Sequence, residues 1–151
     1  MNTGQRTGAI RKLLALPAMD VADLVVAQLY ILFAWARVRL RRRRALLRTV
    51  APRSVPSQRH DLVRLTRIAL AVDRVARFGV VQPTCLVRAI ALELMIRRAG
   101  AGSAVVRVGV LPGGRTLAAH VWIELDGQVI GDEPPFVRQF IPLSDVSAMR
   151  A

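Results

Sequence analysis

The hydrophobic pattern of the chain changes once, near Gly100, and this change limits the fold more than any other feature. Before it, apolar residues recur at helical spacing, most clearly at 61–79 and 85–98. After it, runs rich in β-branched residues predict short strands at 103–110, 116–125 and 128–132. Helices followed by neighbouring strands favour an α+β fold.

The two clearest helices differ in how their surfaces are divided. Segment 61–79 carries apolar residues on one face and arginines on the other, so we expect the arginines to be solvated. Segment 85–98 follows Pro83, which disfavours helix before it, and Thr84, which is a favourable N-cap. The sequence therefore places Cys85 in the first turn of a helix.

Positive charge is concentrated in the first part of the chain. The formal net charge is +13; residues 1–60 hold 12 Lys and Arg against 2 acids, whereas residues 61–151 hold 11 against 8. The excess lies chiefly in RVRLRRRRALLR at 37–48, and a linker with two prolines follows at 51–60. We therefore expect a basic helical region, 1–60, and a core, 61–151, with the basic region either part of the same unit or a docking extension.

A long apolar segment precedes the arginines. Asp20 is a favourable cap for a helix after Pro17, and the apolar stretch Leu24–Ala36, interrupted by Gln28, spans 13 residues. A bilayer needs roughly 20, so we expect a core helix with a solvated basic tail. Alternatively, 20–48 docks on a partner protein or on the inner membrane surface, since a basic run beside an apolar face suits anionic lipid. Nucleic acid is disfavoured, because no aromatic residue is interleaved with the arginines.

Cysteine and histidine are scarce, and this limits the chemistry. With one cysteine the chain forms no intramolecular disulfide, so we expect a reducing, cytoplasmic location. One cysteine and two histidines also disfavour a structural zinc site, and we expect no metal and no cofactor. Apolar residues make up 53% of the chain, too many for a disordered protein. No clear secretory signal peptide is recognisable.

Cys85 is a candidate nucleophile because of its place in the helix. The unpaired N–H groups and the positive end of the helix dipole favour thiolate over thiol, and the same N–H groups can form an oxyanion hole. Arg88, one turn later, could help to hold an anion. The plainer interpretation is a small buried apolar residue, which is the commoner role of a lone cysteine.

His120 is a candidate base, although a histidine in a strand is by itself more simply interpreted as a half-buried residue with its hydrogen bonds satisfied. The hairpin that follows decides its partner. If Asp126 and Gly127 form a two-residue loop, counting back along the strands sets His120 opposite Glu133 and turns Asp132 to the other face. A three-residue loop instead sets His120 directly opposite Asp132, at the distance of a cross-strand pair. The sequence permits either loop. Trp122 and Glu124 share the face of His120 in both cases.

Three segments together resemble a known family: CLVRAIALELMIRRAG at 85–100, VVRVGV at 105–110 and AAHVWIELDGQVIGD at 118–132. Over residues 83–133 the chain resembles the transglutaminase/papain-like cysteine protease of lasso-peptide biosynthesis, the leader peptidase or B protein. The family pattern is a Cys-Leu-x-Arg helix start, an Ala-His-x-Trp-x-Glu strand and an Asp closing the next strand. These residues are Cys85, Leu86, Arg88, Ala119, His120, Trp122, Glu124 and Asp132.

The resemblance implies a nucleophile helix packed on a small antiparallel sheet, preceded by N-terminal helices, and a catalytic Cys85–His120–Asp132 triad. It implies amide hydrolysis through an acyl-enzyme, which removes the leader from a lasso-peptide precursor. The N–H of Cys85 would be an oxyanion donor, and Gln82 could add a side-chain donor. Trp122 would shield the imidazole or contact substrate; the alternative is that it packs in the core.

The resemblance also implies partners. The chain is similar to the stand-alone peptidase without the leader-binding recognition element, so we expect it to need that recognition protein besides the precursor peptide. The ATP-dependent lasso cyclase is a further expected partner, and nucleic acid is not. Two alternatives stay open: an acyltransferase of the transglutaminase type on the same fold, and a non-enzymatic basic module that binds nucleic acid or membrane through 37–48.

Overall fold

The computed structural model describes residues 18–40, 61–101, 104–112 and 118–143. The predicted linker 51–60 and most of the basic run 37–48 lie outside these residues. The helices are α2 (Ala18–Leu40), α3 (Leu62–Phe78), α4 (Cys85–Arg98) and the short α5 (Pro134–Val137). The strands are β1 (Val105–Val110), β2 (Ala119–Leu125), β3 (Gln128–Ile130) and β4 (Ile141–Pro142). The predicted α+β class is confirmed.

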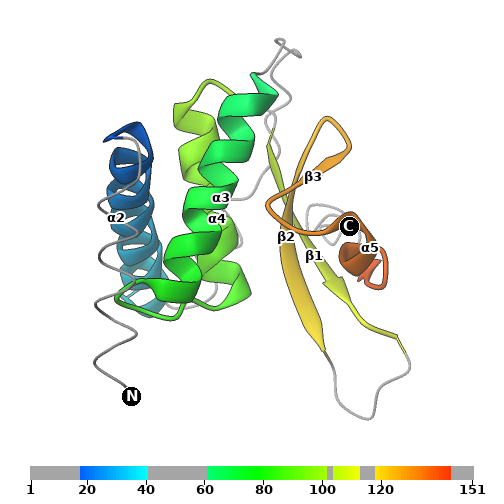
Figure 1. Ribbon diagram of the computed structural model, residues 1–151. Helices are drawn as coiled ribbons and strands as arrows, with labels where there is room; N and C mark the ends of the chain where they lie inside the picture. The colour runs from blue at the N-terminus through cyan, green and yellow to red at the C-terminus, as the bar shows by residue number, and fades with distance from the viewer. Residues whose placement is uncertain (1–17, 41–60, 102–103, 113–117, 144–151) are drawn as a thin grey trace, which may run out of the picture.

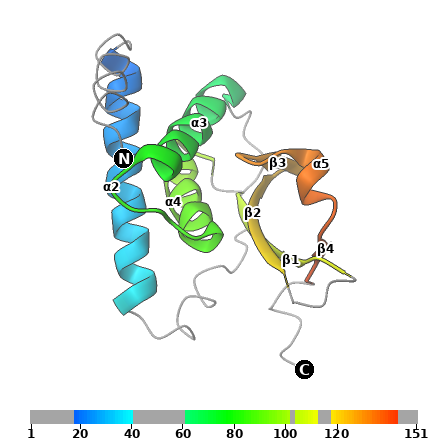
Figure 2. The same ribbon diagram turned by 60° about the horizontal axis from the view of Figure 1, so that its bottom comes forward.

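The elements form layers around α4. The sheet has the order β3-β2-β1-β4, and all its neighbouring strands are antiparallel. Figures 1 and 2 show α3 and α4 between the sheet on one side and α2 on the other. Helix α4 packs against α2, α3, β1 and β2, so it lies at the centre of the molecule. The position of the residues at the N-terminus of α4 is therefore fixed by packing against most of the other elements.

The core is aliphatic and continuous from α2 to the sheet. Ile31 of α2, Val72 of α3, Ile96 of α4 and Ile123 of β2 are all almost completely buried in one cluster. Burying a side chain of this kind contributes about 1.5–3 kcal/mol relative to leaving it exposed. The buried residues of the helices and of β2 thus belong to one hydrophobic core.

The first helices differ from expectation in three respects. Helix α2 begins at Ala18, so Asp20 lies in its first turn and is not its cap. By length and composition alone, Asp20–Leu40 could cross a membrane, although core helices of soluble proteins and signal sequences meet the same criteria. The expectation that the segment is too short counted only the apolar stretch Leu24–Ala36. Arg67 of α3 is not simply solvated, because its Nη2 lies 2.6 Å from Asp23 Oδ2 of α2.

The chain after the second hairpin strand also differs from expectation. The third strand ends at Ile130, not at Asp132, because Gly131 has a φ of 82° and turns the backbone out of the strand. The tail, expected to be irregular, contains α5 and β4. A proline opens α5, as suits the first turn of a helix, and β4 pairs with β1 at Gly109 and Val110.

Glu93 is a buried carboxyl of α4, and it makes stability depend on pH. It is 8% exposed and accepts a hydrogen bond of 3.1 Å from Arg97 Nη1. Burial raises the pKa of Glu93 above its ordinary value of 4.5, and Arg97 opposes this only in part. A pKa higher in the folded than in the unfolded chain means that ionisation of Glu93 lowers the free energy of unfolding as pH rises above 4.5.

We expect Glu93→Gln to remove this cost. The melting temperature of the variant relative to wild type should rise between about pH 4 and about pH 7, because only the wild-type side chain ionises in that interval. Thermal unfolding followed by circular dichroism at several pH values measures the difference. A difference that is constant, or that falls with pH, would contradict the interpretation.

Candidate active site

Cys85 is the first residue of α4, as predicted, and the local sequence explains its position. Thr84 is the N-cap: its Oγ1 accepts from the N–H of Val87 at 3.4 Å, and its carbonyl accepts from the N–H of Arg88 at 3.0 Å. Such a cap contributes about 1 kcal/mol to the helix. The N–H groups of Cys85 and Leu86 have no partner within the helix, so they are free to meet an oxyanion. The thiol is free and half-buried.

His120 lies on β2, opposite Gly109 of β1. The prediction that Trp122 and Glu124 share its face is confirmed: the rings of His120 and Trp122 are stacked with centroids 6.3 Å apart, and Trp122 Nε1 donates to Glu124 Oε1 at 3.0 Å. Arg107 Nε donates to the other oxygen of Glu124, also at 3.0 Å. Trp122 is 1% exposed, so it forms a fixed wall beside the imidazole.

The rest of the imidazole environment comes from the tail of the chain. Phe136 of α5 and Phe140 lie with ring centroids 5.1 Å and 5.3 Å from that of His120. Opposite His120, an added Cβ on Gly109 would lie 2.7 Å from Trp122, so only glycine leaves room for the indole there. His120 Nε2 is buried and has no hydrogen-bond partner, which leaves a polar atom facing inward without compensation.

Asp132 approaches this nitrogen by a route that neither predicted register describes. The hairpin has the two-residue loop, with Leu125 paired to Gln128 and positive φ angles at Asp126 and Gly127. That register was expected to turn Asp132 away from His120, which is wrong. Because β3 ends before Gly131 and the chain turns there, Asp132 Oδ1 lies 3.6 Å from His120 Nε2.

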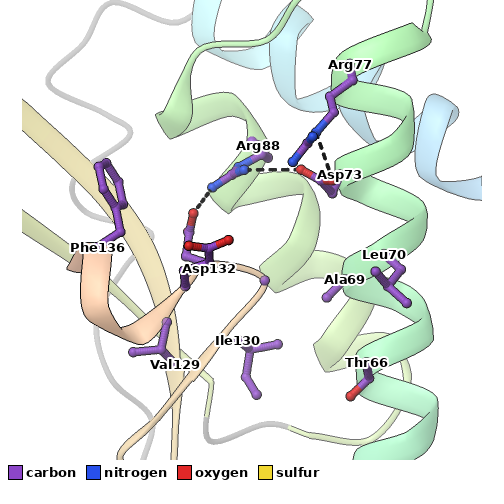
Figure 3. A pocket seen from close by; sticks show the side chains of 12 residues that line it. Thr66, Ala69, Leu70, Asp73, Arg77, Arg88, Val129, Ile130, Asp132 and Phe136 are labelled. Carbon is purple, nitrogen blue, oxygen red and sulfur yellow. Dashed lines mark hydrogen bonds and ion pairs between the residues drawn. The ribbon is translucent and has the colours of Figure 1, made fainter. Parts of the chain in front are cut away.

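Arg88 connects this carboxylate to the nucleophile helix. Its Nη2 donates to Asp132 Oδ1, and its Nη1 lies 3.7 Å from Asp73 Oδ1 of α3. Figure 3 shows Arg88 between the two carboxylates, with Arg77 reaching down to Asp73 from above. Arg77 Nε lies 3.0 Å from Asp73 Oδ2. The four charges link α3, α4 and the segment after β3.

A cavity of about 660 Å³ opens beside these charges. Its walls come from α3, α4, β3 and α5, and they combine apolar side chains with Asp73, Arg88, Asp132 and Glu133. Figure 3 shows Phe136 at one side of the cavity and α3 at the other. Ligand sites have this size and this mixture of apolar surface with a few polar groups.

The predicted site residues are brought together in part. His120, Asp132 and Arg88 meet, and Cys85 lies one turn before Arg88 on α4, a spacing that puts both on one helix face. The hydrogen bonds of the described residues do not include one between Cys85 Sγ and the imidazole. Gln82 is exposed in the segment before α4. Among the described residues, no three His, Cys, Asp or Glu side chains form a metal site.

Asp73 is the site residue that sequence reasoning missed. It is the only acidic residue of α3, a helix that otherwise carries arginines. That isolation was a usable signal, because a single carboxylate among arginines is a natural partner for a further cation. Only the packing of α3 against α4 shows that the cation is Arg88.

A cysteine at a helix N-terminus, with a histidine on the neighbouring sheet and a carboxylate just after its edge strand, is an arrangement also found in thiol enzymes that form acyl intermediates. The model of the transglutaminase-like superfamily matches residues 27–145, most of the chain. The chain therefore belongs to the transglutaminase-like superfamily, whose members are generally cysteine peptidases or acyltransferases. No curated protein and no solved structure gives a significant match.

Gly131 should be essential to the placement of Asp132. An alanine there would have to adopt a φ of 82°, and its Cβ would lie 2.7 Å from Leu92 Cδ2 in the core. At Gly127 the φ is 80° but nothing lies within 4 Å, so Gly127→Ala carries the same backbone strain without the crowding. We expect Gly127→Ala to cost about 1–2 kcal/mol and Gly131→Ala roughly 1–3 kcal/mol more.

Urea denaturation of both variants measures this difference in the free energy of unfolding. The rate of the thiol-dependent reaction proposed in the next subsection gives a second comparison. Gly131→Ala should lose activity at temperatures where it is still folded, whereas Gly127→Ala should keep most of it. Equal effects of the two substitutions would mean that the turn after β3 does not position Asp132.

Proposed function

We propose that the chain is a cysteine peptidase that removes the leader from a lasso-peptide precursor. The observation that carries the proposal is the 3.6 Å approach of Asp132 Oδ1 to His120 Nε2, beside the helix that begins with Cys85. A buried imidazole nitrogen facing a carboxylate, near a thiol at a helix N-terminus, is what thiol-dependent acyl transfer requires. Hydrogen bonds of catalytic groups are often long without substrate.

The roles follow from the nitrogen that Asp132 approaches. Asp132 approaches Nε2 of His120, so it favours the proton on that atom and leaves Nδ1 to exchange a proton with the Cys85 thiol. The thiolate of Cys85 then attacks the scissile carbonyl, and the N–H groups of Cys85 and Leu86 face the oxyanion. The imidazolium gives its proton to the leaving amine. Water, deprotonated by the imidazole, then hydrolyses the thioester and restores the thiol.

Arg88 and Asp73 act as positioning residues in this proposal. The side chain of Arg88 is 22% exposed and that of Asp132 12% exposed, so their ion pair is largely shielded from water. A shielded guanidinium–carboxylate pair fixes the carboxylate more firmly than an exposed one. Asp73 holds the same guanidinium from α3. Through these two ion pairs, the packing of α3 on α4 determines the position of Asp132 relative to His120.

The substrate and partners come from the family pattern. The residues Cys-Leu-x-Arg at Cys85, Ala-His-x-Trp-x-Glu around His120 and the closing Asp132 resemble the lasso-peptide leader peptidase. The cavity beside Asp132 has room for a few side chains of an extended peptide, and it adjoins the proposed triad through Asp132, since Cys85 and His120 are not among its lining residues. We propose that a separate leader-binding protein delivers the precursor, that the ATP-dependent cyclase receives the product, and that the free thiol works in a reducing cytosol.

The proposal can be tested with the full chain, the precursor peptide and the leader-binding protein. Because Cys85 is the only cysteine, a thiol-specific alkylating reagent blocks that residue alone. We expect one cut at the leader–core bond, detected by mass spectrometry, and none after alkylation. A leader product that carries an added amine, not a free acid, would identify the chain as an acyltransferase. Cleavage unchanged after complete alkylation would overturn both.

A further inference from the structure

Helix α2 has an apolar surface that the other helices and strands described by the structure do not cover. Val25, Leu29 and Phe33 are spaced four residues apart, so they form one line along the helix, which we call the outer strip. They are 55%, 60% and 51% exposed. The opposite side of α2 is the buried one, with Ala27, Ile31 and Ala34 fully enclosed. A helix that is apolar all round is normally covered on every side.

The outer strip faces away from the candidate active site. Figures 1 and 2 show α2 on one side of α3 and α4, with the sheet and α5 on the other. The ion pair between Asp23 and Arg67 and the enclosed inner residues hold α2 to the fold in this orientation. A surface that covered the outer strip would therefore leave the cavity beside Asp132 open to solvent.

Positive charge adjoins the strip at its C-terminal end. Arg37 and Arg39 are in the last turn of α2, and the sequence continues directly into RRRR at 41–44. Between Asp23 and Asp61 the sequence contains no acidic residue. In the sequence, α2 is therefore followed directly by the most basic segment of the chain.

The two arginines lie along aromatic rings of the same helix. The guanidinium carbon of Arg37 is 5.5 Å from the centroid of Phe33, and that of Arg39 is 4.3 Å from the centroid of Trp35. Arginine side chains that run over apolar surface with their charge at the edge are typical of a membrane–water interface. A nucleic acid would be bound by the arginines but would gain nothing from the apolar strip.

We propose that α2 docks this protein on an anionic lipid bilayer. The outer strip enters the boundary between headgroups and acyl chains, while Arg37 and Arg39 pair with lipid phosphates. The helix lies on the bilayer and does not cross it, because its inner face stays packed on α3 and α4. The proposal does not rest on the peptidase activity, since the two sites are on opposite sides of the molecule.

The test is co-sedimentation of the full chain with vesicles of phosphatidylcholine alone or mixed with phosphatidylglycerol. We expect binding to the mixed vesicles, weakened by salt, and little to the neutral ones. Leu29→Glu and Phe33→Glu should each lower the partition coefficient about tenfold, because a carboxylate replaces apolar contact. Ile141→Glu, a substitution of an equally exposed apolar residue on β4, is the matched control and should bind like wild type.

Far-UV circular dichroism first establishes that each variant is folded, and cleavage in vesicle-free solution should be the same for Leu29→Glu and wild type. Three results would overturn the proposal. They are the absence of binding to anionic vesicles, binding that Leu29→Glu and Phe33→Glu leave unchanged, and bound protein that alkaline carbonate fails to extract. The second result would indicate a polyanion site of the arginines alone, and the third a membrane-spanning helix.

Discussion

Cys85→Ala is expected to reduce leader cleavage to the rate without enzyme. The thiol is the only group in the chain that can form a thioester, and removing a nucleophile of this kind lowers kcat by about 10⁶-fold in well-studied hydrolases. The substitution is small and the side chain is only half-buried, so the fold should be retained. Initial rates by mass spectrometry, with the precursor and its leader-binding protein present, measure the effect.

Two comparisons make this result informative. The variant should melt within a few degrees of wild type and should still bind the precursor, which separates loss of chemistry from loss of structure or affinity. Cleavage by Cys85→Ala at the wild-type rate would remove this thiol from the mechanism. The helix start would then be a structural feature, and the cysteine a small apolar residue packed beside the core.

Asp132→Asn is expected to lower kcat by about 10²–10⁴-fold. The amide keeps the shape of the side chain but loses its charge, and it can present an N–H to His120 Nε2. That arrangement would stabilise the tautomer with the proton on Nδ1, which cannot accept the thiol proton. The expected signature is a fall in kcat with a smaller change in KM, measured by steady-state cleavage of the precursor.

Asp73→Asn is the matched control for this prediction. Both carboxylates contact Arg88, but only Asp132 approaches His120. If Asp132 acts on the imidazole, its substitution should cost far more activity than that of Asp73. Equal losses in the two variants would mean that Asp132 serves only as an ion-pair partner of Arg88, and the proposed triad would be wrong.

The sequence was sufficient for the elements whose ends are set by local chemistry. Thr84 caps α4 because its hydroxyl reaches the N–H of Val87, and a capping interaction of this kind depends on only a few adjacent residues. The α+β class followed from the single change of period near Gly100 for the same reason. The face shared by His120 and Trp122 also followed, because alternation along a strand is a local property.

The position of Asp132 could not be predicted in that way. Counting from the hairpin assumes that the strand continues, and β3 stops at Ile130 because Gly131 adopts a positive φ. A glycine in a strand pattern indicates a bend, but not where the chain goes next. That is decided by the Arg88 guanidinium, which draws the carboxylate toward α4 past the short edge strand. Long-range ion pairs of this kind leave no periodic trace in a sequence.

Because α4 is central, the candidate site has two parts that differ in how well they tolerate substitutions. Cys85 and Arg88 are carried by a helix enclosed by α2, α3 and the sheet, so most substitutions on α4 would first cost stability. Apart from Asp132, which the Arg88 ion pair holds, the segment between Ile130 and Val137 is largely exposed, and Glu133 and Phe136 can vary with little cost to the core. Proteins of this architecture can therefore acquire new substrate preferences by changing that short segment while the helix with the nucleophile remains the same.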